Sequence, residues 1–538
     1  MDRQFEAMQH TSVDLLVIGG GIYGAWTAYD AALRGYRVAL VDKTDWAAGT
    51  SSASSKLIHG GLRYLEHFNF GLVRHGLAER ATLTRIAPHA VDPIRFVIPK
   101  YHGDRVASWK MRIGLALYDL LAGRGQPVAP HDRFDASELR ESFPYLSTDG
   151  LIGGFSYGDC QEDDARVTLE VVAAAQRAGA LVANHTAVSE LLRMGDRVVG
   201  ARVEDRLGGR TGQIRARLTV NAAGPWAPDL AGGRSVVGNY KLIKGVHLMM
   251  PELPGPKDAF LLTARSDGRV FFVIPWYDHT IIGTTESDYQ GDPKDLTVYE
   301  DEAEYLLEEA NRALRQANWT RQDIRGCFAG VRTLMGGTDD SLSAVSRDFM
   351  VRKASPGLWM PIGGKYTTAR GDAEEIIDMA RAELGPARGT RRTDQQPLAW
   401  APSGDVSQWR AEAEADARAL GVDARAAMWL VKRHGTGTDV VLDLIRTEPS
   451  LAQRLHEDCP FIRAEVVHAA QHEMARSLAD VLRRRLPVML MLAPDAELAR
   501  TAAGLMAPVL GWDEDAVSGQ CEAALALWPG ISPRIQPD

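Results

Sequence analysis

A glycine-rich loop near the N-terminus offers the clearest chemistry in this sequence. Gly19, Gly21 and Gly24 have the spacing of a dinucleotide-binding fingerprint, and the apolar run 13–18 leads directly into them. The first glycine permits a tight turn, the second lets the backbone approach a pyrophosphate, and the third lets a helix pack closely on the strand. Asp42 ends the next apolar run, where a carboxylate can bind a ribose diol. An isolated glycine triplet would indicate only a turn, but the strand, loop, helix and strand order favours a dinucleotide site.

A second set of motifs indicates which dinucleotide to expect. The hydroxyl-rich stretch 50–56 leads into Leu57-Ile58-His59-Gly60-Gly61-Leu62-Arg63-Tyr64-Leu65-Glu66. This region, from Thr50 to His67, resembles the signature of the aerobic, FAD-dependent glycerol-3-phosphate dehydrogenases. The resemblance continues in the family's order to about residue 385, in blocks at 157–160, 220–226, 242–247, 273–276, 281–285, 330–332 and Gly363-Gly364-Lys365-Tyr366-Thr367-Thr368-Ala369-Arg370.

The glycine loop and the resemblance together predict which residues hold FAD non-covalently. The small residues 222–224 follow a strand and allow the backbone to approach a cofactor closely, although a plain turn would look the same. Residues 363–365 precede a predicted helix, so backbone amides can face the flavin edge that gains negative charge on reduction. The predicted cofactor residues are Gly19, Gly21, Gly24, Asp42, Thr50, Ser51, Ser55, Lys56, Ala223, Gly224, Gly363, Gly364, Lys365 and Thr367.

The resemblance also implies a reaction, the oxidation of sn-glycerol 3-phosphate to dihydroxyacetone phosphate. Such a reaction needs a hydride acceptor, an acceptor for the hydroxyl proton and a cationic pocket for the phosphate. Arg63, Arg332 and Arg347 lie in blocks that the resemblance places around the substrate, and Lys365 adds a fourth charge. Guanidinium groups bind phosphate through a bidentate fork, although arginines more often form surface ion pairs, and Arg347 also suits an exposed turn.

Two histidines are candidates for the proton acceptor. Imidazole titrates near neutral pH, and His247, which follows a lysine and a glycine, is the first choice ahead of His59. Either histidine can instead be structural, and ionisation of the alcohol assisted by Arg63 and Arg332 is an alternative that makes these arginines catalytic. Tyr64 and Thr284 are expected to donate neutral hydrogen bonds to the substrate.

The elements that must position these residues indicate an α/β fold. The predicted architecture is a Rossmann-type FAD-binding domain interleaved with a mixed-sheet substrate domain, followed by an all-α C-terminal cap domain. The FAD-dependent oxidoreductase part is expected at 1–395, with FAD-binding parts at about 10–95, 150–235 and 325–385 and substrate parts at about 96–149 and 236–324. The polar stretch 386–402 is typical of a linker, and the helical domain is expected at 396–538, with periodic helices at 464–485 and 495–510.

Composition excludes several classes of function. A net charge of −9 and a pI near 5.9 argue against a nucleic-acid partner, which would require concentrated basic residues. The cysteines, Cys160, Cys327, Cys459 and Cys521, are far apart and support neither a metal site nor a disulfide framework. The sequence shows no signal-peptide stretch and no apolar run long enough to span a membrane. A cytoplasmic, reducing compartment is therefore expected.

The resemblance implies an electron acceptor and a membrane surface. Dehydrogenases of this family pass electrons to a membrane quinone, so peripheral association with the inner face of the cytoplasmic membrane and a possible homodimer are expected. The segment 109–121 has the composition of an interfacial helix, strengthened by Arg95, Lys100 and Arg105 nearby, but we favour a buried helix of the substrate domain. For the basic run 483–485 we favour a solvated helix end over a site for an anion or a lipid headgroup.

Alternatives to this function stay open. A glycerol-3-phosphate oxidase that reduces O₂ would share the same flavin and phosphate residues, a related flavin amine oxidase would not need the accumulated cations, and a flavin-binding scaffold would show no turnover. The sequence departs from the family's usual pattern at Tyr23 and Trp26, where smaller or polar residues are expected, and at Tyr366 and Ala369.

Overall fold

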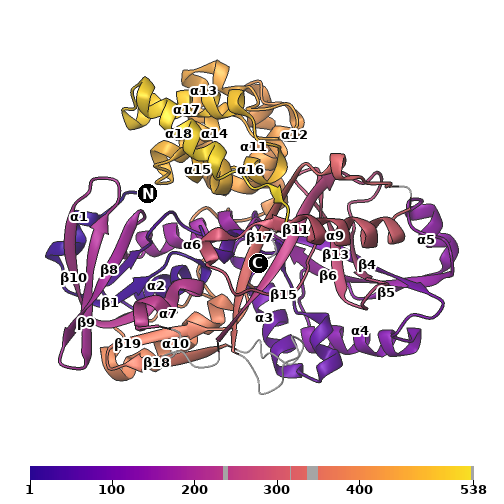
Figure 1. Ribbon diagram of the computed structural model, residues 1–538, viewed down its shortest axis with the longest axis horizontal. Coiled ribbons are helices and arrows are strands. Elements are labelled where there is room, and N and C mark those ends of the chain that lie inside the picture. The colour runs from indigo at the N-terminus through magenta and orange to yellow at the C-terminus, as the bar shows by residue number, and fades with distance from the viewer. Residues whose placement is uncertain (234–239, 316, 336–348, 535–538) are drawn as a thin grey trace.

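The first of two sheets carries the glycine loop. The structure is a computed structural model that describes residues 1–233, 240–315, 317–335 and 349–534, so Arg347 lies outside the described residues. The strand order of the first sheet is β18-β19-β10-β1-β2-β7, with β9 attached to β10 and β8 to β9 (Figure 1). These strands are β1 Val13–Ile18, β2 Val38–Val41, β7 Leu181–Ala183, β8 Thr186–Met194, β9 Arg197–Asp205, β10 Thr211–Asn221, β18 Met350–Ser355 and β19 Leu358–Ile362. Every residue of β1 is buried, as a strand covered on both faces requires.

Three helices cover this sheet and bring distant segments together. They are α2 Ile22–Leu33, α6 Asp164–Arg177 and α10 Ala369–Leu384, and α2 contacts both of the others. Because β1 pairs in parallel with both β2 and β10, the carboxyl ends of these strands meet at one edge of the sheet. The glycine loop lies at that edge, which is where ligands bind in open α/β sheets.

The second sheet is mixed and alternates with the first along the chain. Its order is β15-β11-β14-β13-β12-β4-β6-β3, with β17 paired to β11 and β5 to β6. The strands are β3 Leu57–Ile58, β4 Asp92–Tyr101, β5 Asp132–Phe134, β6 Leu151–Gln161, β11 Tyr240–Pro251, β12 Ala259–Thr263, β13 Val270–Trp276, β14 His279–Gly283, β15 Ser287–Asp288 and β17 Gly326–Met335. The pair β12 and β4 is parallel and the others are antiparallel, so the predicted interleaved α/β fold with a mixed sheet is confirmed.

Helices flank the second sheet, and one differs from expectation. They are η2 Leu62–His67, α3 Phe70–Ile86, α4 Ser108–Ala122, α5 Ala136–Ser142 and α9 Glu300–Ala313. The prediction that 109–121 is a buried helix is wrong: α4 packs on α3 and η2 along one side only, and its buried residues are Leu115 and Tyr118. Among the described residues, no helix is long and apolar enough to span a bilayer.

The C-terminal part is helical, as predicted, and lies above both sheets in Figure 1. Its elements are α11 Val406–Ala419, α12 Ala424–His434, α13 Thr438–Thr447, α14 Arg463–His472, α15 Leu478–Asp480, η9 Val481–Arg485, α16 Val488–Met491, α17 Ala496–Leu510 and α18 Glu514–Ala526. The predicted helix 464–485 is not continuous, because α14 ends at His472 and Met474 adopts a left-handed φ of 56°. The segment resumes as α15 and the π-helical turn η9.

The basic run in η9 joins the helical domain to the first sheet. Arg484 and Arg485 are buried and bind Asp45, with Arg484 Nε at 2.8 Å and Arg485 Nη1 at 2.6 Å from Asp45 Oδ2. Asn184 Nδ2 donates to the other carboxylate oxygen at 2.9 Å. The expectation of a solvated basic run is therefore wrong, because Asp45 draws both guanidinium groups into the domain interface.

Replacing Asp45 by asparagine is expected to destabilise the protein by about 3–5 kcal/mol, because Arg485 would remain buried without its hydrogen-bonded carboxylate and Arg484 would keep only Asp480. Calorimetry or urea unfolding measures the change. In contrast, Glu190→Gln removes an exposed ion pair with Arg202 and should change stability by less than about 1 kcal/mol. Equal effects of the two substitutions would contradict the role assigned to Asp45.

Candidate active site

The glycine loop is built for close contacts on one side and an open approach on the other. A Cβ on Gly24 would lie 1.8 Å from the Gly19 oxygen, so α2 can pack on β1 only with glycine at this position. A Cβ on Gly21 would meet Ser51 alone, whose Oγ would lie 3.0 Å away. Ser51 Oγ accepts a hydrogen bond from the Ile22 amide at 2.9 Å and so caps the first turn of α2. The arrangement leaves a helix N-terminus that suits an anion such as a pyrophosphate.

Asp42 and Thr50 fix the loops on either side of this helix terminus. Asp42 Oδ2 accepts from the Gly20 amide at 2.7 Å, and Oδ1 accepts from the Thr44 amide at 2.8 Å. Asp42, directly after β2, therefore supports the glycine loop itself. The Thr50 hydroxyl donates to the Val331 carbonyl at 2.7 Å and anchors its turn, η1 Thr50–Ser52, on β17.

The side chains of Ser55 and Lys56 have different partners. Ser55 Oγ lies 2.9 Å from His247 Nε2, so the hydroxyl-rich segment reaches the predicted proton acceptor. The Lys56 side chain is buried, with Nζ donating to Asp164 Oδ1 at 2.5 Å and to the Ser52 carbonyl at 2.8 Å. The ammonium group of Lys56 is thus used in a buried ion pair, and its backbone is bonded as well, because the amide donates to Ser54 Oγ at 3.0 Å and the carbonyl accepts from the Glu162 amide at 3.0 Å.

His247 is buried in the second sheet with its ring held on both sides. The ring stacks on Phe328 at 4.7 Å between centroids, and a Cβ on Gly283 would lie 2.5 Å from it. Burial first, and then the charges of Lys56 and Arg332, lowers the pKa of His247 to about 3. The imidazole is therefore neutral at neutral pH. Its Nδ1 has no hydrogen-bond partner in the described part of the chain.

Two of the predicted phosphate-binding arginines lie together. Glu286 Oε1 is 3.4 Å from Arg63 Nη2 and 3.2 Å from Arg332 Nη1, so one carboxylate holds two like charges side by side. A Cβ on Gly245 would lie 2.5 Å from Thr284 Oγ1 and 3.1 Å from Arg332 Nη2, which places Thr284 in the same group. Both arginines are about one-third exposed and can reach a ligand.

Lys365 and Tyr64 form a neighbouring group that the unusual Tyr23 supports. Lys365 Nζ lies 3.6 Å from the centre of the Tyr64 ring. The Tyr23 hydroxyl accepts from the Lys365 amide at 3.0 Å and donates to Asp372 Oδ2 at 2.6 Å. A Cβ on Gly364 would lie 1.7 Å from this hydroxyl, so the large Tyr23 requires glycine opposite it. The departure from the family pattern is thus accommodated by local packing.

The other predicted residues lie at the rim of the same region. Gly363 and Gly364 have positive φ values of 74° and 76°, which form the turn before α10. The Thr367 hydroxyl accepts from the His59 amide at 3.2 Å, and so joins this turn to the segment before η2. Ala223 and Gly224 follow β10, next to the end of β1.

Sequence reasoning missed two acidic residues in this region. Glu286 lies two positions after the predicted Thr284, and an acid among several arginines is a signal for an ion pair. Asp164, at the start of α6, had no local signal, because its partners Ser54 and Lys56 are more than 100 positions away. Long-range ion pairs of this kind are not visible in spacing.

Two protein-family profiles and several known proteins match this chain. A profile of FAD-dependent oxidoreductases matches residues 14–379, and a profile of the C-terminal domain of α-glycerophosphate oxidase matches residues 391–517. A glycerol-3-phosphate dehydrogenase of Synechocystis sp. is 35% identical, with 91% of each chain covered. A D-erythritol 1-phosphate dehydrogenase of Brucella abortus is 37% identical, with 88% of this chain and 93% of that protein covered.

A solved structure shares the whole fold. The glycerol-3-phosphate dehydrogenase from Bacillus halodurans, determined as a complex with FAD, superimposes with a TM-score of 0.79 at 27% identity. The match covers 99% of this chain and 98% of that one, so both the interleaved sheets and the helical domain are common to the two proteins.

The neutral state of His247 predicts a pH dependence of stability. The imidazole protonates near its ordinary pKa of 6.5 in the unfolded chain and only at about 3 in the folded one. Between these values the unfolded state binds more protons, so this contribution to the free energy of unfolding is lost as pH falls from 6.5 toward 3. Urea unfolding from pH 7.5 to 4.5 should show a smaller loss for His247→Gln than for the wild type. Identical pH profiles would contradict burial of a neutral imidazole.

Proposed function

This chain belongs to the FAD-dependent oxidoreductase family, in which its relatives include glycerol-3-phosphate dehydrogenases, and we propose that it oxidises sn-glycerol 3-phosphate to dihydroxyacetone phosphate. The observation that carries the proposal is the pair Arg63 and Arg332, held side by side by Glu286 next to His247. Two guanidinium groups at one place match the two negative charges and several oxygens of a phosphate monoester.

The residues around the glycine loop fit FAD. Gly21 places no side chain at the helix N-terminus, Ser51 accepts only from the Ile22 amide there, and Asp42 stands where a ribose is bound in this type of fold. The turn at Gly363, Gly364 and Lys365 would present backbone amides to the flavin. Bound FAD supplies a two-electron acceptor for the hydride of the alcohol carbon.

The protein's own residues would hold and ionise the alcohol. Arg63 and Arg332 bind the phosphate, while Thr284 and Tyr64 donate neutral hydrogen bonds. His247 is the first candidate to accept the hydroxyl proton: its Nε2 contacts Ser55 Oγ, and its Nδ1 is buried. Its low pKa opposes a full proton on the ring, so the cationic charge of Arg332 is needed to favour the ionised alcohol. His59 is the second candidate for proton acceptor.

A related phosphorylated polyol is a second candidate substrate. The relative from Brucella abortus, named for D-erythritol 1-phosphate, matches this chain about as well as the relatives named for glycerol 3-phosphate. The two compounds share a phosphate and a secondary alcohol and differ in chain length. The same arginine pair can serve either, so a direct comparison is required.

Anaerobic reduction of the FAD-loaded protein tests the proposed reaction. Glycerol 3-phosphate should bleach the flavin absorbance, whereas glycerol and sarcosine should not, because neither carries a phosphate for Arg63 and Arg332. Faster bleaching by D-erythritol 1-phosphate would move the assignment to the longer polyol. Bleaching by sarcosine would favour an amine oxidase, and no bleaching would leave a flavin-binding scaffold.

A matched pair of variants tests the phosphate site. Arg332→Ala should raise the KM for glycerol 3-phosphate about 30- to 100-fold and leave FAD bound, because a charged hydrogen bond contributes about 2–3 kcal/mol. Arg325→Ala, at the exposed position just before the same strand, should leave the KM unchanged. An unchanged KM for Arg332→Ala would remove this residue from the pocket.

We propose that the electrons pass to a membrane quinone and that the protein docks peripherally on the cytoplasmic membrane. Trp109, Ile113 and Leu120 lie on one face of α4, with 62%, 60% and 75% of their surface exposed. Phe68 and Phe70, on the adjoining η2 and α3, are 77% and 41% exposed. Exposed aromatic and aliphatic side chains on adjoining elements indicate an interaction surface. We call these five residues the apolar face.

Basic residues border the apolar face, as binding to anionic lipids requires. Lys110 and Arg112 on α4 are exposed. Other cations expected to contribute are engaged elsewhere: Arg95 binds Asp258, Lys100 is buried and binds Asp104, and Arg105 binds Glu66. The basic component is therefore confined to α4 and its surroundings. Homodimerisation stays a prediction.

The triple variant Trp109→Ser, Ile113→Ser, Leu120→Ser should lower the affinity for anionic vesicles at least about tenfold, because each buried side chain contributes on the order of 1 kcal/mol or more. Turnover with a soluble dye acceptor should not change. The control variant Met194→Ser, Leu207→Ser removes exposed apolar side chains from another surface and should bind vesicles as the wild type does. Equal vesicle binding by all three proteins would contradict docking through α4.

A further inference from the structure

The first turn of α6 contacts both segments that surround the candidate site. Asp164 is fully buried, and its Oδ2 accepts from the Ser54 amide at 2.9 Å while Oδ1 accepts from Lys56 Nζ. These two bonds enclose Ser55, the residue in contact with His247. Lys56 has a left-handed φ of 60°, a strained conformation for a residue with a side chain, so the segment requires this support.

The same turn of α6 also supports the loop before α10. The Tyr366 hydroxyl donates to the Asp164 carbonyl at 2.6 Å and lies 2.9 Å from the Thr168 hydroxyl. Tyr366 follows Lys365 directly and precedes Thr367, which binds the His59 amide. One helical turn therefore fixes the segments 52–56 and 363–367 relative to each other.

Arg166, in the same turn, is bound by the C-terminal helical domain. Its Nε donates to the Arg433 carbonyl at 2.6 Å, its Nη2 lies 3.2 Å from His434 Nδ1, and its Nη1 lies 2.5 Å from Glu473 Oε1. The guanidinium also lies 4.7 Å from the centre of the Trp400 ring. Arg166 is 1% exposed, so all its partners are protein groups of the domain interface.

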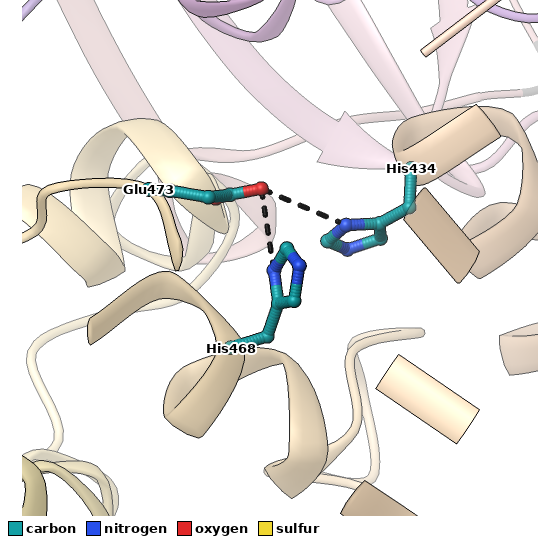
Figure 2. Close-up of side chains that lie close together, drawn as sticks. All are labelled: His434, His468 and Glu473. Carbon is teal, nitrogen blue, oxygen red and sulfur yellow. Dashed lines mark ion pairs between the residues drawn. The ribbon is translucent and has the colours of Figure 1, made fainter. Parts of the chain in front are cut away.

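Figure 2 shows His434 and Glu473, two partners of Arg166, together with His468, which pairs with Glu473. Their ligand atoms lie within 4.8 Å of one another, a spacing that a metal ion could also use. However, Arg166 already forms an ion pair with Glu473 Oε1 and a hydrogen bond with His434 Nδ1, and a guanidinium at these two atoms repels a second cation. His434 donates through Nε2 to Glu465 at 2.9 Å, which leaves Nδ1 as the acceptor that Arg166 requires. The cluster is therefore a receptor for an arginine.

We propose that the C-terminal helical domain positions the active site through Arg166, the positioning residue. By binding Arg166, the domain fixes the first turn of α6, and this turn fixes the segments 52–56 and 363–367. The domain provides the Arg433 carbonyl, His434 and Glu473 as the binding partners of the Arg166 side chain. Two residues earlier in the chain, Asp164 holds Ser54, Lys56 and the Tyr366 hydroxyl. The inference rests on the proposed function, because it describes how the geometry around His247 is maintained.

Two substitutions along this path test the proposal in the FAD-loaded protein. Arg166→Lys keeps the charge but loses the fork that binds three groups, and Tyr366→Phe removes only the hydroxyl that reaches Asp164. Both should lower kcat for glycerol 3-phosphate, by about tenfold for Arg166→Lys and less for Tyr366→Phe, with KM changed less than about twofold because Arg63 and Arg332 are untouched. In the protein without FAD, hydrogen exchange should rise in peptides 52–58 and 363–368.

Two control variants lie in the C-terminal helical domain, away from α6. Arg454→Lys makes the same substitution in a forked ion pair with Asp423, and Leu442→Ala loosens the domain core. Both should leave kcat and exchange in the two site peptides unchanged, although Leu442→Ala lowers Tm.

The proposal is overturned if Tyr366→Phe leaves kcat and exchange at wild-type values, a result that stands even if Arg166→Lys fails to fold. It is also overturned if Leu442→Ala lowers kcat as much as the two test variants do. Failure of the wild-type protein to be bleached by either phosphorylated polyol would overturn the proposed function instead, and the exchange data would still report on the role of Arg166.

Discussion

The buried carboxylate of Asp164 is the constraint on which the arrangement of the site depends. A carboxylate removed from water is costly unless it is paired and hydrogen-bonded, and Asp164 is fully buried. Its oxygens are satisfied by Lys56, by the Ser54 amide and by the Ala165 amide of its own helix. Moving the segment 52–56 away from α6 would leave two opposite charges unpaired in the interior. The ion pair therefore holds a strained segment in place beside His247.

The positive charges around His247 disfavour a proton on the imidazole and stabilise a nearby anion. Lys56 and Arg332 add to burial in depressing the pKa of the imidazole, so a proton on the ring is disfavoured. The same charges stabilise an anion nearby, which includes an ionised alcohol and a phosphate. Glu286 offsets part of this charge in the protein without substrate by binding both Arg63 and Arg332. A histidine that accepts a hydrogen bond, next to arginines that stabilise the alkoxide, is the division of roles that this electrostatic environment favours.

The sequence was sufficient for the parts of the fold that depend on local pattern. The strand before Gly19, the helix after it and the interleaved mixed sheet follow from apolar periodicity, glycine positions and motif order, and the structure confirms them. The predictions of a buried helix at 109–121 and of a continuous helix at 464–485 were wrong, because composition does not show which side of a helix meets a partner.

The contacts within the site were less predictable than its residues. Arg63 and Arg332 were expected near each other, but the carboxylate that joins them was not. Lys56 was expected at the cofactor, yet its ammonium group pairs with Asp164, more than 100 residues away in sequence. Such ion pairs depend on which charges become buried together, and only the folded chain determines that.

The short helix η2 connects the two surfaces that the proposed function requires. Arg63 and Tyr64 lie in its first turn at the candidate site, and Phe68, at its C-terminal end, is 77% exposed on the apolar face. The helix is bounded by left-handed residues, Gly61 with φ 78° and Phe68 with φ 55°, so sharp turns set both ends. Phe68 adopts this conformation at a cost for a residue with a side chain, while exposing an aromatic ring to solvent. An oxidase that uses dissolved O₂ gains nothing from an apolar surface beside its site. An acceptor dissolved in the bilayer, which we propose to be a quinone, would require such a surface.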